Sequence, residues 1–499
     1  MTDTGIEGRE RAEQLARSDW GLAAALAVVS GLLFALTFQT RTCADGHGLV
    51  TLHVLQGKER YQHALYLPLC DLVQGALGLR DPFLVLHLIS IAGGGLGLGA
   101  GYLVLRLCGA ARSGALVAIG LAAFSPALWF FATTVHTQPL LFGAVACLAL
   151  FTLLAPWQRP GLALALVAAL FPLLFLAHES SFTLGPGWVL LVQFARARRG
   201  SRFSWPGLLL GVGPLLLAAL GLGLLVSMWM RFGSLAPIWD EFQKQLQVQS
   251  SRDSDLLRTP PVWRDEWLLP QGLLVPLAAA GFARLPRANG LALAVAFLVG
   301  VPTLFFLWWG VFEHGGYFLG SQLFLLVPVA FLFARRGRAW VALALALLAG
   351  QALLARHRID AYDTGWDPAE RNAQVRAAIG ESGLLLTTAG LAPDVRCWLP
   401  GVEERSLTSF VRNACKQERR MVPPERILAQ LKPRLDTLLE RSPRVCVELG
   451  YPAVTIEDAV VTVALVPHLR VLEAYLRERY EVRDLPHPWW PMMVLVKRR

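Results

Sequence analysis

Residues 82–107 read PFLVLHLISIAGGGLGLGAGYLVLRL. This stretch contains no Asp, Glu or Lys, and its only Arg stands near its end. An α-helix needs roughly 20 predominantly apolar residues to cross the hydrocarbon core of a bilayer. The stretch therefore predicts a transmembrane helix, and it is one of several such runs along the chain.

Comparable apolar runs occupy most of the first 355 residues. We expect about eleven spans, at residues 19–38, 82–107, 113–131, 137–155, 161–177, 181–195, 207–230, 267–283, 290–311, 317–334 and 339–355. The composition agrees, since 55% of the 499 residues are hydrophobic and only 16% are charged, against about 25% in a typical soluble domain. Residues 64–79 are too short to cross and predict a helix at the membrane interface. The expected fold is mainly α, a polytopic membrane helical bundle.

The positive charge of the chain does not indicate a nucleic-acid partner. The formal net charge is +10, but Arg residues gather in short clusters between apolar runs, as in RARRGSR (196–202) and RRGR (335–338). Such clusters are typical of cytoplasmic loops and of contact with lipid headgroups. If the N-terminus is cytoplasmic, every predicted cytoplasmic loop contains Arg, and residues 356–499 lie outside. One missed or surplus span in the second half would reverse that last conclusion.

The last third of the chain has the texture of a small α/β domain. GLLLTTAG (383–390) and RVCVELG (444–450) predict buried strands of a parallel sheet. Residues 423–442 and 466–480 have helical periodicity, and WWPMMVLVKRR (489–499) predicts an edge strand. No Gly-rich phosphate loop follows a strand, so a nucleotide-binding module is not expected. The predicted organisation is a cytoplasmic segment (1–18), a transmembrane domain (19–355) and an external C-terminal domain (356–499).

Ionisable and amide side chains recur where predicted helices meet the external side. Candidate site residues there are Asp45, His47, Lys58, Arg60, His63, His136, Gln138, His178, Glu179, Glu313 and His314. A carboxylate just outside a span, such as Asp45, can act as a general base. Each residue taken singly also fits helix capping or a solvated loop. Several acidic or His-bearing helix ends on one face favour a reaction site at the membrane surface.

Four stretches resemble GT-C membrane glycosyltransferases of the protein-mannosyltransferase-like kind. The first external loop matches at Asp45, Gly57, His63, Tyr66, Pro68 and Leu69, and a second stretch matches at Ser125, Pro126, Trp129 and Ala132. His178 and FEHGGYFLGSQLFLL (312–326) are similar to features at two later helix ends. The resemblance covers roughly residues 19–195 and 305–334. Two departures are His136, where the family often has an acidic residue, and Gly46-His47 beside the first Asp.

The resemblance implies transfer of a sugar from a polyprenyl-phosphate donor to an acceptor hydroxyl at the external face. Asp45 would be the general base, and Lys58 and Arg60 are the nearest cations for the leaving phosphate. The remaining candidates would bind substrate. The acceptor is a protein, lipid or glycan, a divalent cation is a candidate cofactor, and the metal ligands are unknown. The implied location is the bacterial inner membrane, with the active site outside.

Two other functions remain open from the sequence. A polytopic transporter or lipid flippase would also have many spans, but it should show internal repeats and charges near the bilayer midplane. No clear repeat is present, and the ionisable residues cluster at helix ends. A catalytically degenerate GT-C-like scaffold is the other alternative, because His136 departs from the family pattern.

Overall fold

The computed structural model describes two compact units of the chain. The described residues are 15–39, 65–79, 81–199, 213, 221–222, 226, 263–286, 290–309, 313–334, 337–362, 368–387, 399, 401–418, 422–442, 444–448, 456–485 and 492–496. Of these, the residues up to 359 form a helical unit, and those from 360 onward belong to a second unit.

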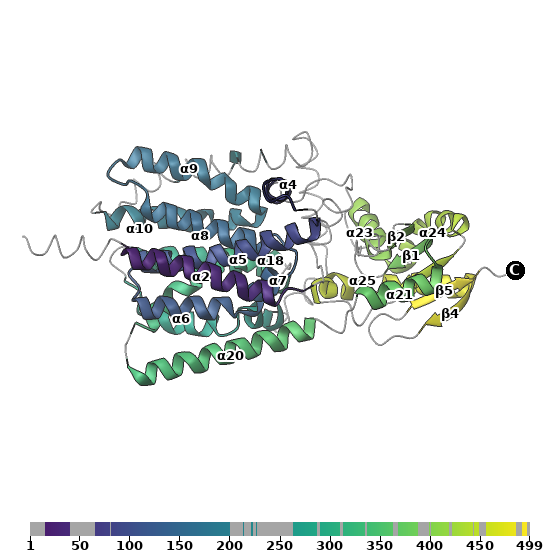
Figure 1. Cartoon of the computed structure of the whole chain (residues 1–499). Helices are drawn as coiled ribbons and strands as arrows, with labels where there is room; N and C mark the ends of the chain where they lie inside the picture. The colour runs from purple at the N-terminus through teal and green to yellow at the C-terminus, as the bar shows by residue number, and fades with distance from the viewer. Residues whose placement is uncertain are drawn as a thin grey trace, which may run out of the picture. The chain divides into compact units, whose positions relative to one another are not determined.

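The helical unit is a bundle of apolar helices (Figure 1). Its longer helices are α2 (Arg17–Leu36), α4 (Tyr66–Leu77), α5 (Pro82–Leu107), α6 (Arg112–Ala123), α7 (Pro126–Thr133), α8 (Gln138–Leu154), α9 (Pro160–Ala177), α10 (Gly185–Arg198), α17 (Leu274–Phe282), α18 (Leu291–Trp309), α19 (Leu319–Leu332) and α20 (Arg338–Tyr362). Short helical turns precede three of them: η1 (Glu179–Leu184), η3 with α16 (Arg264–Leu268 and Leu269–Gln271) and η4 (Glu313–Phe318).

Helices form at ten of the eleven predicted spans, and the eleventh (207–230) lies almost wholly outside the described residues. Five described helices are long and apolar enough to cross a membrane, and α6 with α7 would make a sixth. Others, such as α8, are shorter than the 18 residues that this criterion requires. The chain thus has several membrane-spanning helices, while the count of eleven stays a prediction.

The predicted continuous span 113–131 is wrong in one respect, because α6 and α7 meet at an angle of 59°. The break falls at Ser125, whose Oγ accepts a hydrogen bond from the backbone N–H of Leu128 at 3.3 Å. Ser125 therefore caps α7, and Pro126 follows at its first turn. Proline has no backbone N–H and cannot continue the preceding helix, so a new helix starts here.

Glycines along α5 allow its two neighbours to approach closely. A Cβ on Gly95 or Gly99 would lie 2.7 Å from Ala27 O or 2.6 Å from Ala23 O of α2. A Cβ on Gly97 would lie 2.4 Å from the Phe142 ring of α8. Small residues at intervals of four are the usual means by which helices in membranes pack backbone to backbone. The glycine run seen in the sequence therefore positions α5 at the centre of a three-helix layer.

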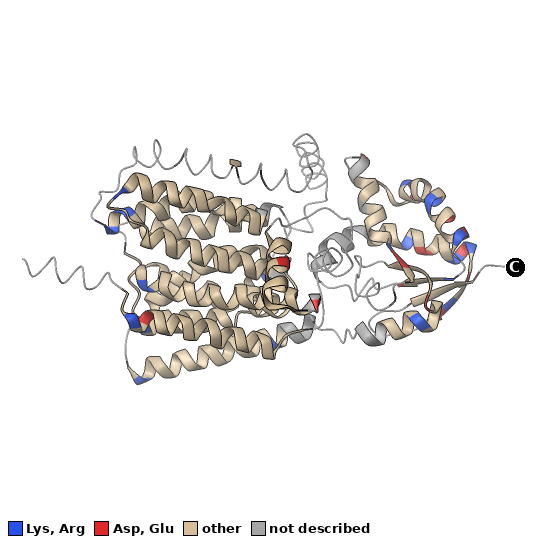
Figure 2. Cartoon of the chain, turned by 45° about the horizontal axis from the view of Figure 1, so that its top comes forward, with Lys and Arg blue, Asp and Glu red and all other residues tan. Residues whose placement is uncertain are grey.

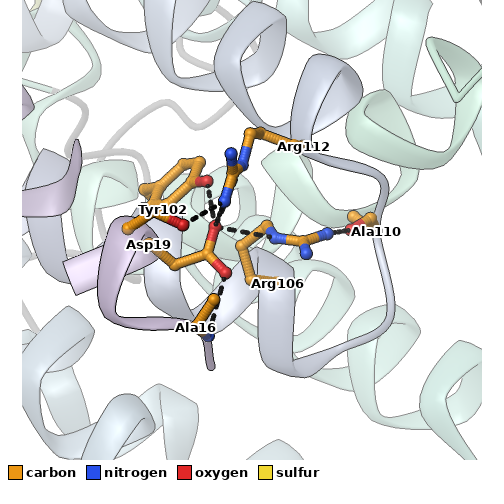
Figure 3. Close-up of polar contacts among 7 residues, drawn as sticks. Ala16, Asp19, Tyr102, Arg106, Ala110 and Arg112 are labelled. Carbon is orange, nitrogen blue, oxygen red and sulfur yellow. Dashed lines mark hydrogen bonds and ion pairs between the residues drawn. The ribbon is translucent and has the colours of Figure 1, made fainter. Parts of the chain in front are cut away.

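A buried ion-pair cluster joins the start of α2 to the turn between α5 and α6 (Figure 3). Asp19 Oδ1 accepts hydrogen bonds from the Tyr102 hydroxyl at 2.7 Å and from Arg112 Nη2 at 3.0 Å. Arg106 Nε approaches the same oxygen at 3.4 Å, while Oδ2 accepts from the backbone N–H of Ala16 at 3.3 Å. A carboxylate that is 2% exposed needs such partners to offset its desolvation.

Lys and Arg residues gather at one end of the helical unit, which we call the basic end (Figure 2). It is defined by Arg106, Arg112, Arg198 and Arg338, which lie in the first or last turns of their helices. Helices α2 and α20 both begin there, and the chain leaves α20 at the opposite end (Figure 1). This asymmetry agrees with the orientation predicted from the Arg-bearing loops, in which the basic end is cytoplasmic.

The second unit contains a five-stranded mixed sheet in the order β2-β1-β3-β5-β4. The strands are β1 (Gly383–Thr387), β2 (Val402–Ser406), β3 (Val445–Glu448), β4 (Glu481–Leu485) and β5 (Met492–Val496). The first three are parallel, whereas β5 is antiparallel to both β3 and β4. Helices α23 (Leu407–Glu418), α24 (Pro424–Arg441) and α25 (Ile456–Arg479) pack on one face, and α21 (Pro368–Ile379) on the other.

The predicted edge strand in 489–499 is wrong in its position in the sheet. Strand β5 forms within that stretch but lies between β3 and β4. Met492 and Met493 are buried on opposite faces, as an interior strand requires. The edge strands are β2 and β4. The sequence of β4, EVRDL, is largely exposed, and charged residues are common on edge strands because they discourage pairing with another chain.

Candidate functional site

Three of the predicted site residues meet in the interior of the helical unit, at the end opposite the basic end. His136, Gln138 and His178 are each at most 1% exposed. The side-chain amide of Gln138 lies 3.0 Å from His178 Nε2, although the two residues stand 40 positions apart in the sequence. Helix α8 begins at Gln138 and α9 ends immediately before His178. We call these three residues the histidine cluster.

Backbone hydrogen bonds determine the tautomers of both imidazoles. The N–H of Ser180 donates to His178 Nδ1 at 3.1 Å, and the N–H of Gln138 donates to His136 Nδ1 at 3.2 Å. A backbone N–H is always a donor, so each Nδ1 must carry a lone pair. A neutral imidazole has one protonated nitrogen, and in both rings the proton therefore lies on Nε2.

Aromatic rings enclose the histidine cluster. The Phe131 ring lies 4.5 Å from the His136 ring, and Tyr317 meets His178 edge-on at 5.5 Å between ring centroids. Tyr317 belongs to η4, which approaches so closely that a Cβ on Gly316 would lie 3.2 Å from Gln138 Cγ. The cluster is therefore polar but shielded, and hydrogen bonds gain strength in such surroundings.

Ser90 of α5 and Tyr66 of α4 support the cluster through hydrogen bonds that include the backbone of His136. The Ser90 hydroxyl accepts from the backbone N–H of His136 at 3.1 Å and donates to its carbonyl oxygen at 3.0 Å. The Tyr66 hydroxyl lies 3.2 Å from Ser90 Oγ and donates to Leu86 O at 2.8 Å. Sequence reasoning missed Ser90 entirely, because a serine inside an apolar run gives no signal of its own.

Both described ends of the loop that contains Asp45 are attached near the histidine cluster. At one end, Gln39 pairs with Thr133 at the end of α7 through backbone and side-chain hydrogen bonds of 2.8 and 2.9 Å. At the other, the N–H of Leu65 donates to Leu176 O, two residues before His178, at 2.9 Å. The segment that contains Asp45 thus starts and finishes at this end of the bundle.

The remaining predicted site residues are not tested by these contacts. Asp45, His47, Lys58, Arg60 and His63 lie outside the described residues. The backbone of Glu179 belongs to η1, and that of Glu313 and His314 belongs to η4. The structure does not describe the side chains of these three residues. Their roles stay predictions.

A second buried polar group, the glutamine cluster, was not predicted from the sequence. It comprises Gln271, Gln322 and Gln351 with Ser125. Gln322 Nε2 donates to Ser125 Oγ and to Gln271 Oε1, each at 2.8 Å, and Gln351 Oε1 accepts from the N–H of Leu273 at 2.8 Å. These bonds join α19 and α20 to two interruptions of the helical backbone, the α6–α7 break and Gly272.

Among the described residues, no group of three or more His, Cys, Asp or Glu side chains could hold a metal ion. The loop with Asp45 and His47 lies outside that part of the chain. A divalent cation therefore remains an untested candidate.

Comparisons with known proteins place the fold. No family model and no curated protein matches the chain. Among solved structures, the chain is similar to ArnT from Cupriavidus metallidurans bound to undecaprenyl phosphate, with 13% identity, a TM-score of 0.54, and coverage of 96% of this chain and 99% of that one. An Archaeoglobus fulgidus oligosaccharyltransferase tethered to an acceptor peptide matches at 13% identity and a TM-score of 0.48, covering 94% of this chain and 73% of that one. The chain shares the fold of the ArnT structure, in line with the membrane helical bundle that the sequence resemblance implied.

Proposed function

We propose that this GT-C-like chain is a membrane glycosyltransferase that moves a sugar, expected to be a hexose, from a polyprenyl-phosphate donor to an acceptor hydroxyl. The observation that carries the proposal is the buried histidine cluster at the end of the bundle where the Asp45 loop starts and finishes. The similar ArnT structure binds undecaprenyl phosphate, which supports a lipid-linked donor for this chain.

The expected chemistry is an inverting displacement. Asp45 takes the proton of the acceptor hydroxyl, whose oxygen attacks the anomeric carbon of the sugar. The bond between that carbon and the phosphate oxygen breaks, and its electron pair leaves with the polyprenyl phosphate. Lys58 and Arg60 would stabilise the phosphate charge as it develops. A donor carried by a lipid requires the reaction centre to lie at the membrane surface.

The test is transfer of a radiolabelled sugar from its polyprenyl phosphate in membranes that contain the Asp45→Asn variant. We expect activity to fall by at least about 100-fold, since a positioned general base contributes about 10²–10⁴. The matched control is Asp71→Asn, the same change at an exposed position on α4, which should keep wild-type activity. Full activity of Asp45→Asn would show that Asp45 is not the base.

The external location of the reaction has its own test. Reporter fusions after residue 362 should be active only outside the cytoplasm, because α20 starts at the basic end and the chain leaves it at the opposite end. A cytoplasmic signal from these fusions would overturn both the eleven-span count and the external site. A panel of donor sugars and of protein, lipid and glycan acceptors would then identify the substrates.

A further inference from the structure

The contact between Gln138 and His178 has a consequence for the orientation of the glutamine amide. His178 carries its proton on Nε2, because its Nδ1 accepts the N–H of Ser180. The amide atom 3.0 Å away must accept that proton, so it is the carbonyl oxygen. Amide oxygen and nitrogen are distinguished by their hydrogen-bond partners. His178 thereby directs the NH₂ group of Gln138 to the other side of the amide.

That other side of the Gln138 amide has no hydrogen-bond partner among the described residues. Gln138 is 0% exposed, so water outside the protein does not supply one. A buried donor without an acceptor is costly, and such groups in native structures call for an explanation such as a ligand. His178 contacts the amide at 3.0 Å, and the stem of the side chain is confined as well, since a Cβ on Gly316 would lie 3.2 Å from Gln138 Cγ.

We propose that Gln138 donates a hydrogen bond from its NH₂ group to a phosphate oxygen of the polyprenyl-phosphate donor, and that His178 is the positioning residue that fixes this orientation. The inference rests on the proposed function, which brings a lipid phosphate to this end of the bundle. A neutral amide donor suits this task, since it binds an anion by a hydrogen bond and adds no charge to a buried site.

The same geometry excludes the reverse arrangement for this pair. If the Gln138 NH₂ group faced His178, His178 Nε2 would have to accept and Nδ1 would have to carry the proton. Nδ1 would then oppose the N–H of Ser180 at 3.1 Å, with two donors in contact. The Nε2-protonated ring avoids that repulsion and satisfies both neighbours.

The experiment measures binding of undecaprenyl phosphate, and of undecaprenol as the analogue without phosphate, to the purified full chain in detergent. Gln138→Met removes the donor at similar volume and should weaken undecaprenyl phosphate binding by about 10- to 100-fold, the range for a hydrogen bond to a charged group. Gln138→Glu places an acceptor there and should bind more weakly still. Neither change should alter binding of undecaprenol.

Variants of His178 test positioning separately. His178→Ala frees the amide to rotate and should weaken undecaprenyl phosphate binding less than Gln138→Met does. His178→Gln supplies an N–H donor at the place of the ring Nε2 and should restore binding toward wild type. A purely structural role for His178 would not predict this rescue.

The matched control is Gln193→Met on α10. Gln193 is also buried, with a side-chain nitrogen that has no partner among the described residues, but it lies toward the end of α10 that carries Arg196 and Arg198. The Gln193→Met variant should leave the binding of undecaprenyl phosphate unchanged. Wild-type affinity in both Gln138 variants, or an equal loss for undecaprenol, would overturn the proposal. If the Gln138 variants do not fold, the test rests on His178→Ala and His178→Gln. Binding in His178→Gln that is no tighter than in His178→Ala would then contradict the proposal.

Binding is measured without turnover, so the two proposals can fail independently. Full sugar transfer by the Asp45→Asn variant would rule out Asp45 as the base. It would leave intact the predicted ranking of the Gln138 and His178 variants by their affinity for undecaprenyl phosphate. Unchanged binding in the Gln138 variants would remove the donor contact and leave the role of Asp45 open to its own test.

Discussion

The Ser90 hydroxyl bonds to both backbone groups of His136, accepting from the N–H at 3.1 Å and donating to the carbonyl at 3.0 Å. One side chain of α5 thereby replaces the secondary structure that residue 136 lacks between α7 and α8. The position of His136, and of Gln138 after it, depends on this pair of bonds, because buried backbone groups need partners.

Ser90→Ala should therefore destabilise the chain by about 1–2 kcal/mol, the cost of leaving buried backbone groups unpaired. The measurement is the thermal unfolding midpoint in detergent. Ser113→Ala is the matched control, because the buried Ser113 hydroxyl has no partner within the described part of the chain. Equal midpoints for the two variants would contradict the supporting role of Ser90.

Arg112→Met should lower the thermal unfolding midpoint of the chain slightly. The substitution removes one of two guanidinium groups from the buried Asp19 carboxylate, but Arg112 is 46% exposed, and solvent weakens such a pair. Thermal unfolding is again the measurement. Arg338→Met, the same change at an exposed position of the basic end, should have little effect. A comparable loss in both variants would attribute the effect to net charge instead of to the Asp19 cluster.

Gly95→Ala should destabilise the bundle by about 1–3 kcal/mol, the usual range for overpacking. Its new Cβ would lie 2.7 Å from Ala27 O, and backbone atoms cannot move aside as a side chain can. Gly300→Ala on α18 has open space around the new methyl group and should be neutral or stabilising by up to about 1 kcal/mol. The ratio of folded to aggregated protein after heating compares the two, and a tolerated Gly95→Ala would mean that α2 and α5 are not packed in this way.

The second unit should lose stability in strong alkali through Tyr475. Burial, together with the hydrogen bond to Asp436, raises the pKa of Tyr475 to about 12. A pKa raised on folding stabilises the folded state below the unfolded value near 10, and this stabilisation is lost as the pH rises from about 10 through 12. Melting midpoints at pH 9 and pH 11 should therefore differ less in Tyr475→Phe than in the wild type. An identical difference in the two proteins would exclude Tyr475 as the group responsible.

The positions of the helices could be predicted closely from the sequence, because a bilayer imposes a minimum apolar length that can be counted along the chain. The concentration of Arg at one end was also predictable, because the orientation of membrane spans depends on the charge of their loops. The break at Ser125 and Pro126 was missed, although Pro after a capping residue is a local signal. Residues 113–131 are apolar on both sides of this break, so apolar length alone predicts one continuous span and gives no sign of the bend.

The contacts of the candidate site could be predicted only in part. His136, Gln138 and His178 stood out as polar residues at helix ends, but nothing in their spacing indicates that the Gln138 amide meets His178. Ser90 and the glutamine cluster lie inside apolar helices, where one polar side chain gives no periodic signal. Hydrogen bonds between distant helices depend on how those helices pack and rotate, and the small residues of α5 govern that packing.

Hydrophobicity and loop charge act locally along the chain, so the sequence was enough to predict a membrane protein of many helices with an α/β unit at its end. Its resemblance to the GT-C family at scattered positions agreed with the fold found by comparison at 13% identity. The protonated nitrogen of His178 and the orientation of the Gln138 amide, in contrast, could be assigned only from contacts between distant segments. Those properties arise from donors and acceptors brought together by packing, and no pattern along a single helix contains them.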